Sequence, residues 1–133
     1  MIDFKKFIDY DIFKERGYDL KVKGRLNQGD FATIDEAVDD FLKSCFENLY
    51  NLIESYRGIT WTKMLFEDMS QDLANESEQS QIYQEVIKWA VLEQAVFIYE
   101  NGDINSRAKK DIEYVGYSPK VTRKLWSYGI LRY

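Results

Sequence analysis

Residues 82–102, IYQEVIKWAVLEQAVFIYENG, decide the fold of this chain. The segment reads as a helix with apolar residues around most of its circumference, and Gly102 provides a helix stop directly after Asn101. A helix that is apolar on nearly every side must be enclosed by other elements. We therefore predict an all-α fold, a small bundle of about four helices, with residues from about 79 to 101 as its central helix.

A second long helix is predicted before Gly58, over about 24 residues. Thr33 and Glu36 have the T-x-x-E spacing of a capping box, in which each side chain bonds a backbone N–H of the other residue. Apolar residues then recur at steps of three and four: Ile34, Val38, Phe41, Leu42, Cys45, Leu49, Leu52, Ile53 and Tyr56. Because the single cysteine, Cys45, lies on this stripe, we predict a buried packing residue rather than a reactive thiol.

Shorter elements are predicted around these two helices. Residues 12–16 form a helix with Asp11 as its N-cap and Gly17 beyond its end, and an alternative interpretation extends this helix back to Asp3. Residues 18–31 contain two of the seven glycines and read as a loop, with a short extended piece at 20–22. Residues 59–69 form a short helix opened by Thr60 or Thr62, and the middle of the polar stretch 70–81 forms an exposed loop, with Ser77 or Ser80 capping the next helix.

The chain changes character after Gly102. Residues 112–117 alternate as a short strand would, and Ser118-Pro119 opens a final helix that Gly129 ends. We therefore divide the chain into a helical body, residues 1–103, and a basic, aromatic C-terminal arm, residues 104–133, made of a short extended segment and a terminal helix.

Charge follows the same division. Residues 107–133 carry a net charge of +5 and residues 1–106 carry −10, against −5 for the whole chain. Two interpretations stay open: the arm folds back on its own acidic body, or it binds an acidic surface of another molecule. On the second interpretation the partner-binding residues are the basic and aromatic ones of the arm: Arg107, Lys109, Lys110, Tyr114, Tyr117, Lys120, Arg123, Lys124, Trp126 and Arg132.

The residues that carry most catalytic chemistry are missing from the sequence. There is no histidine, which is the commonest general base and metal ligand, and no glycine-rich phosphate loop. The adjacent acids Asp39-Asp40 and Glu67-Asp68 point in different directions on a helix, so neither pair is a ready acid–base site. The sequence therefore predicts a non-enzymatic protein with no catalytic, metal or cofactor site.

Nucleic-acid binding and membrane insertion are both disfavoured. The arm mixes aromatic and basic residues, as single-strand binding surfaces do, but the whole protein has a pI near 4.8 and would be repelled by DNA. No window approaches the roughly 20 apolar residues of a membrane span, and the N-terminal residues lack a signal-peptide pattern. We expect a cytoplasmic protein, with dedicated DNA binding as a minor alternative.

Four short patterns occur in the order found in a known family. Asp11, Gly17 and Tyr18 fit D-x-x-x-x-x-G-Y, and residues 56–58 read Tyr-Arg-Gly at the end of a long amphipathic helix. Residues 99–102 read YENG, and Ser118, Pro119, Leu125 and Gly129 fit S-P-x-x-x-x-x-L followed by a glycine. In this order the chain resembles the head–tail connector, or head-completion, proteins of tailed phages.

The resemblance implies a non-enzymatic virion protein. Such a protein would assemble as a ring on the portal and dock the next connector or tail protein, while DNA passes through the channel without specific binding. It would be found in the bacterial cytoplasm during assembly and in the virion neck of an active phage, and it could be monomeric when free. The alternative hypothesis is a small soluble helical regulator that binds a protein or nucleic acid through its basic C-terminal segment.

Overall fold

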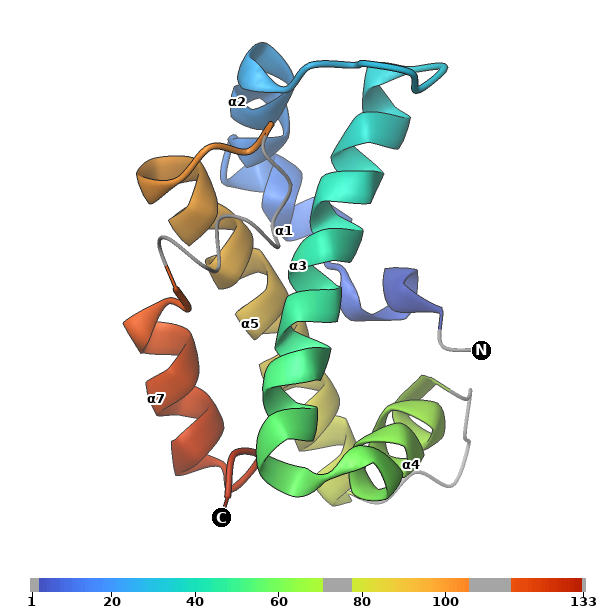
Figure 1. The fold of residues 1–133 in the computed structure, drawn as a ribbon, viewed down its shortest axis with the longest axis vertical. Helices are drawn as coiled ribbons and strands as arrows, with labels where there is room; N and C mark the ends of the chain where they lie inside the picture. The colour runs from blue at the N-terminus through green and yellow to red at the C-terminus, as the bar shows by residue number, and fades with distance from the viewer. Residues whose placement is uncertain (1–2, 71–77, 106–115, 133) are drawn as a thin grey trace.

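The fold is all-α, as predicted. The computed structural model describes residues 3–70, 78–105 and 116–132, and these contain no β-strand (Figure 1). The elements are a 3-10 helix η1 (Phe4–Phe7) and the α-helices α1 (Tyr10–Glu15), α2 (Tyr18–Arg25), α3 (Ile34–Arg57), α4 (Ile59–Ser70), α5 (Glu78–Asn101) and α7 (Pro119–Ser127).

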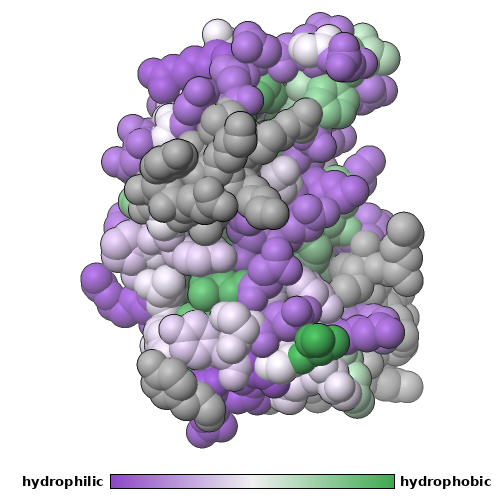
Figure 2. All heavy atoms as spheres, viewed as in Figure 1, coloured by the Kyte–Doolittle hydropathy of each residue, from purple (hydrophilic) through white to green (hydrophobic). Residues whose placement is uncertain are grey.

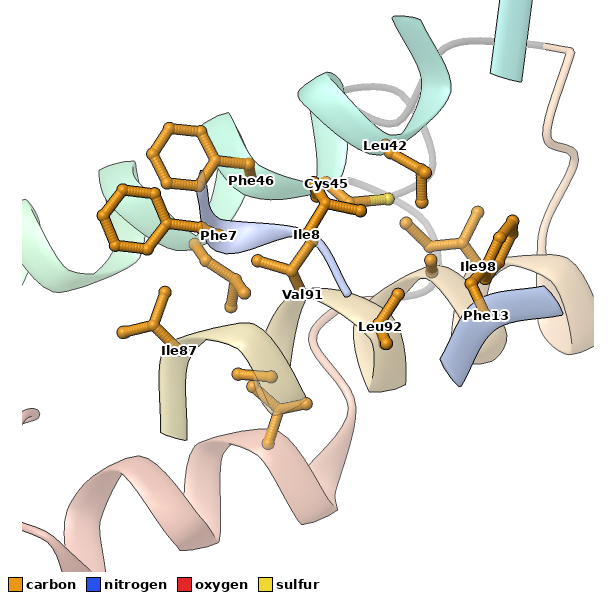
Figure 3. Packing of buried hydrophobic residues seen from close by; sticks show 14 of the residues in the cluster. Phe7, Ile8, Phe13, Leu42, Cys45, Phe46, Ile87, Val91, Leu92 and Ile98 are labelled. Atoms are coloured by element: carbon orange, nitrogen blue, oxygen red, sulfur yellow. The ribbon is translucent and has the colours of Figure 1, made fainter. Parts of the chain in front are cut away.

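Helix α5 lies at the centre of the packing. It contacts α3, α4, α7 and η1, and Ile87, Val91 and Ile98 have no exposed surface. Figure 3 shows these side chains pointing towards Phe7, Leu42 and other apolar residues of η1 and α3. The helix predicted at about 79–101 is thus confirmed to within a residue, and its enclosure is the reason that it is apolar on nearly every side.

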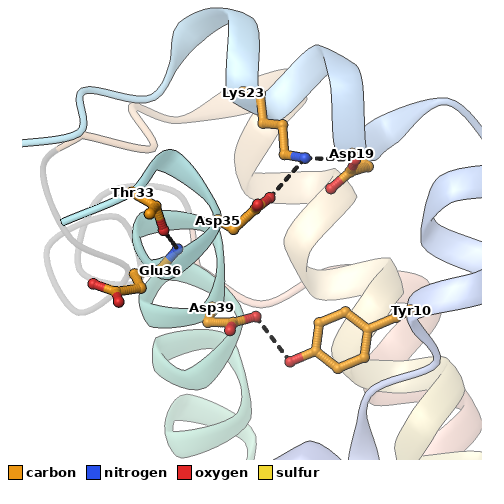
Figure 4. Close-up of polar contacts among 7 residues, drawn as sticks. All are labelled: Tyr10, Asp19, Lys23, Thr33, Asp35, Glu36 and Asp39. Carbon is orange, nitrogen blue, oxygen red and sulfur yellow. Dashed lines mark hydrogen bonds and ion pairs between the residues drawn. The ribbon is translucent and has the colours of Figure 1, made fainter. Parts of the chain in front are cut away.

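The long helix α3 also begins and ends where predicted. The backbone N–H of Glu36 donates to the Thr33 hydroxyl oxygen at 3.2 Å, as in a capping box (Figure 4). The Glu36 carboxylate accepts from the N–H of Ala32 (3.1 Å), one residue earlier than the predicted reciprocal bond. At the other end Gly58 has a φ of +86°, a backbone conformation that side chains with a Cβ rarely adopt. Cys45 is fully buried, as predicted.

The predicted start of the first helix was two residues too late. The N-cap of α1 is Asp9, whose carboxylate accepts from the N–H of Ile12 at 3.1 Å, rather than Asp11. The alternative extension to Asp3 is partly right, because Asp3 caps the separate helix η1. Extended backbone at Ile8 separates the two helices, and the Ile8 side chain is buried in the core.

The predicted loop at 18–31 is wrong over residues 18–25, which form α2, and the short extended piece at 20–22 is part of this helix. Gly17, with a φ of +79°, ends α1 and allows a second helix to start at once. The weak periodicity of α2 reflects its position at the surface, where Val22 is its one buried residue. Lys23 reaches Asp19 at 3.0 Å and Asp35 of α3 at 2.7 Å, and so ties α2 to the start of α3 (Figure 4).

Helix α4 follows α3 with no loop between them. It begins at Ile59 rather than being opened by Thr60 or Thr62, and the buried Thr62 hydroxyl donates to the carbonyl of Gly58 at 2.8 Å. Phe66 of α4 packs against the rings of Phe7, Phe46 and Tyr50, with centroid separations between 4.9 and 5.6 Å. Residues 71–77, most of the predicted polar loop, lie outside the described residues.

Candidate interaction surface

The C-terminal helix α7 has one face in the core and one face in solvent. Ser118 precedes it, and Pro119 occupies the first helical position, where a missing N–H costs nothing. Val121 and Leu125 are fully buried in the same apolar cluster as α3 and α5, whereas Arg123 is exposed. The described part of the predicted arm therefore shares its core with the body.

The chain beyond α7 turns back into the core. Gly129 has a φ of +74°, and the N–H groups of Ile130 and Leu131 both donate to the carbonyl of Leu125, at 2.9 and 3.2 Å. This turn brings the side chains of Ile130 and Leu131 into the core, where they are almost fully buried. Two apolar anchors on the helix and two after it hold α7 in place.

A buried glutamine of the central helix holds the start of α7. Gln94, which has no exposed surface, accepts a hydrogen bond from the N–H of Ser118 at 2.8 Å and donates one to the carbonyl of Gly116 at 3.3 Å. A polar side chain in this position is stable only because both ends of its amide are bonded. In the sequence Gln94 interrupts an apolar run. In the structure its side chain holds the backbone of the residues directly before α7.

Tyr117 also makes contacts inside the molecule. It is half-buried against the core, and its hydroxyl donates to the backbone carbonyl of Asn48 in α3 at 3.0 Å. Burial raises the pKa of the Tyr117 phenol, because the charged form would lose its hydration. Tyr117 thus joins the residues before α7 to α3 as well as to α5.

The outward side of α7 carries the basic and aromatic residues that the sequence singled out. Lys120, Arg123 and Arg132 are exposed, and Trp126 and Tyr128 have 38% and 44% of their surface in solvent. The two described rings beyond Tyr117 are therefore accessible to another molecule, on a helix that is held by its inner face.

Two residues of α7 have neighbours that the sequence prediction missed. The Trp126 ring meets Tyr56 of α3 edge to face, with centroids 5.3 Å apart. The Lys124 ammonium lies 4.0 Å from the ring centroid of Trp89, in cation–π geometry. Both Tyr56 and Trp89 occur in strongly apolar helices, so their sequence signal was that of core residues, and only the packing of α7 brings them to this surface.

A groove separates the start of α7 from the corner between α1 and α2. Its volume is about 460 Å³, and its lining includes Lys120 and Arg123 from α7 and Glu93 and Glu100 from α5. Arg16 of α1 already pairs with Glu93 at 2.8 Å. Part of the basic face of α7 thus looks towards acids of its own chain, as the first of the two sequence interpretations expects.

Four of the predicted site residues, Arg107, Lys109, Lys110 and Tyr114, lie outside the described residues. So does most of the predicted strand at 112–117, of which only the last two residues are described. The division of the chain after residue 103 stays a prediction.

Within residues 3–70, 78–105 and 116–132, no three carboxylate or thiol side chains are grouped so as to hold a metal ion. Over the same residues, no helix has the length and apolar character needed to cross a bilayer. We found no match to a family model, to a curated protein or to a solved structure. The exposed basic and aromatic side chains on and just after α7 form the candidate interaction surface.

Proposed function

We propose that the protein is a non-enzymatic head–tail connector of a tailed phage or prophage, which assembles as a ring on the portal and joins head to tail. In this proposal helices α3, α4, α5 and α7 form a bundle of about four helices. The segment between α5 and α7, together with the outward face of α7, then serves as the arm that reaches the portal or a neighbouring subunit.

The observation that carries the proposal is the position of the four family-like patterns in the fold. Gly17 stands between α1 and α2, Gly58 ends α3, Gly102 follows α5 and Gly129 follows α7. Three of these glycines, Gly17, Gly58 and Gly129, have positive φ values that favour glycine. The patterns thus mark the helix ends that set the path of the chain, which is where a shared fold would leave its sequence signal.

The charge of the molecule is compatible with the same role. An acidic body would let DNA pass through a channel without being gripped, because like charges repel. The aromatic and basic residues on the outward face of α7 are of the types that protein interfaces favour, namely Trp, Tyr and Arg. We infer that this face of α7 binds another protein, and the resemblance to head–tail connectors implies that this protein is the portal.

The decisive experiment is binding to the portal protein encoded alongside the chain. We expect the two purified proteins to co-elute from size exclusion, and electron microscopy to show a ring of this protein on the portal. Because a connector can be monomeric until it meets its portal, the complex and not the free oligomeric state decides the question. Absence of any complex at micromolar concentrations would remove the proposal.

A charge-reversal pair tests whether α7 makes the contact. Replacing Lys120→Glu and Arg123→Glu together should weaken portal binding by about tenfold or more and reduce its salt dependence. The matched control is Lys14→Glu, which reverses an exposed charge on α1 and should leave binding within about twofold of the parent protein. Equal loss in both proteins would mean that net charge, and not the α7 surface, drives the association.

A further inference from the structure

Exposed apolar side chains gather at one end of the molecule. Of the seven large apolar residues that are exposed among the described ones, five lie on α4, at the start of α5 or near the end of α7: Ile59, Met64, Ile82, Trp126 and Tyr128. These elements meet at the lower end of Figure 1. Figure 2 shows pale and green residues over the lower part of the same face, interrupted by purple ones.

Several of these side chains are linked by direct contacts or by a common groove. Ile82 and Tyr128 line one groove of about 620 Å³ between the first turns of α5 and the last turns of α7. On the other side of α7, Trp126 packs on Tyr56, two residues before the Gly58 turn, and Ile59 follows that turn with 68% of its surface exposed. We call the side chains of Tyr56, Ile59, Ile82, Trp126 and Tyr128 the end surface; Met64 of α4 is not part of it.

The charges around the end surface are mainly positive. Lys124 lines the groove, Arg57 lies over the Trp61 ring at 3.8 Å, and Arg132 is exposed just beyond α7. Two acids adjoin them: Glu85 lines the same groove as Lys124 and lies 3.9 Å from Lys88, and Glu54 is one turn before Gly58 at the end of α3. An occupant of the end surface should therefore combine apolar anchors with a negative rim.

A second copy of the chain does not offer that combination at its own end surface. A two-fold contact would place the end surface against itself and bring the basic rims together. The exposed apolar residues Ile12 and Leu20 stand among charges of both signs, with Asp11 and Glu15 exposed as well as Lys14 and Lys21. Self-association of one end surface with another would bring like charges together, which costs free energy.

We propose that the end surface docks an acidic segment of a different protein, with apolar side chains that fill the Ile82–Tyr128 groove and cover Trp126. The inference rests on the proposed function only for the identity of that protein, a portal subunit. Interface energy concentrates in aromatic anchors that become fully desolvated, and Trp126 and Tyr128 are the residues of that kind here.

A synthetic peptide pair tests the chemistry without any portal. The first is a fluorescein-labelled amphipathic helix of about 18 residues, roughly five turns, with Leu on one stripe and Glu elsewhere, and the second has Lys in place of Glu. We expect anisotropy titrations to give binding of the Glu peptide at least about tenfold tighter than the Lys peptide. Equal affinity for the two peptides would overturn the inference. So would the absence of any binding of the Glu peptide at protein concentrations up to about 100 μM.

Variants locate the contact on the end surface. Ile82→Ser with Tyr128→Ser should weaken binding of the Glu peptide about tenfold or more, because both groove walls lose their apolar anchors. The matched control is Leu20→Ser, at the most exposed of the large apolar residues, which should have no effect. Arg132→Glu should lower the affinity for the Glu peptide and raise the affinity for the Lys peptide. Leu20→Ser and Arg132→Glu should unfold as the parent protein does, because both side chains are well exposed. Ile82→Ser with Tyr128→Ser removes partly buried side chains, so its binding is measured under conditions where its own unfolding curve shows it fully folded.

One further variant separates a foreign occupant from the chain's own acidic stretch, QDLANES at 71–77. Replacing Asp72→Ser and Glu76→Ser should leave the affinity for the Glu peptide unchanged. A gain of about tenfold would mean that this stretch competes for the end surface, and would overturn the assignment to a different protein. Because these assays contain no portal, their failure leaves the connector proposal standing, and failure of portal binding leaves the peptide result standing.

Discussion

Replacing Gln94 with leucine should loosen the C-terminal helix before it affects the rest of the fold. Gln94 is fully buried and serves the N–H of Ser118 at 2.8 Å and the carbonyl of Gly116 at 3.3 Å. Ser118 is itself buried, so its N–H would lose the partner that Gln94 supplies at a position shielded from water. The carbonyl of Gly116, which is partly exposed, can hydrate instead.

The expected loss of unfolding free energy is about 2 kcal/mol. An unsatisfied buried N–H costs roughly 1–3 kcal/mol, and the long second bond adds at most about 1 kcal/mol. Leucine has a similar volume and gains roughly 1 kcal/mol from the burial of apolar surface in place of the amide. The net effect should appear in urea unfolding at neutral pH as a lower midpoint with an unchanged slope.

Limited proteolysis should show where the loss occurs. Trypsin should cut the Gln94→Leu protein after Lys120 or Arg123 at least about tenfold faster than the parent, because α7 opens locally at a lower cost. The matched control is Gln81→Leu, an exposed glutamine of the same helix, which should change stability by less than about 0.5 kcal/mol. If both variants were equally stable and equally resistant, the role given to Gln94 in fixing α7 would be refuted.

Three further changes test other parts of the fold. Leu125→Ala should cost about 3 kcal/mol in urea unfolding, because it leaves a cavity under α7; a loss below about 1 kcal/mol would mean that α7 is not anchored by its inner face. Thr33→Ala should cost about 1 kcal/mol by removing the α3 cap, and Thr33→Ser should restore most of it. Burial raises the pKa of Tyr117 above its ordinary value of 10.0, so above about pH 10 the unfolded chain loses its proton first and stability falls as pH rises. Tyr117→Phe should make that fall shallower between about pH 9 and pH 11 in urea titrations, and an unchanged slope would contradict the assignment.

The elements that were predicted well are those with both a strong apolar period and a defined end. Helices α3 and α5 each have some 24 residues of pattern and a glycine directly after the last turn. Helix α2 lacked both signals, since it buries only Val22 and is held by the ion pairs of Lys23, whose partner Asp35 is twelve residues away. A contact of that range leaves no local signature, so a glycine-rich stretch reads as a loop although the helix forms.

The candidate surface was predictable by composition but not by geometry. The excess of basic and aromatic residues after residue 106 directed attention to Trp126, Arg123 and their neighbours. No sequence pattern indicates that Trp126 packs on Tyr56, because the two residues are seventy positions apart. The docking of α7 on α5 depends on complementary apolar faces and on Gln94, and the latter reads in sequence as a flaw in the central helix.

The two faces of α7 allow stability and binding to be separated by adjacent residues. Leu125 is fully buried and Trp126 is 38% exposed, so they belong to opposite sides of one short helix. Leu125→Ala should lower the unfolding free energy, and should weaken partner binding only as far as α7 is displaced. Trp126→Ala should leave most of the stability intact, because the substitution removes mainly the ring contact with Tyr56. Such a contact contributes about 0.5–1.5 kcal/mol beyond the area that it buries. If Trp126→Ala abolished partner binding in a protein that unfolds at nearly the parental urea concentration, the exposed ring would be a contact residue. If binding instead followed stability across both variants, α7 would act only as a structural support for a surface that lies elsewhere.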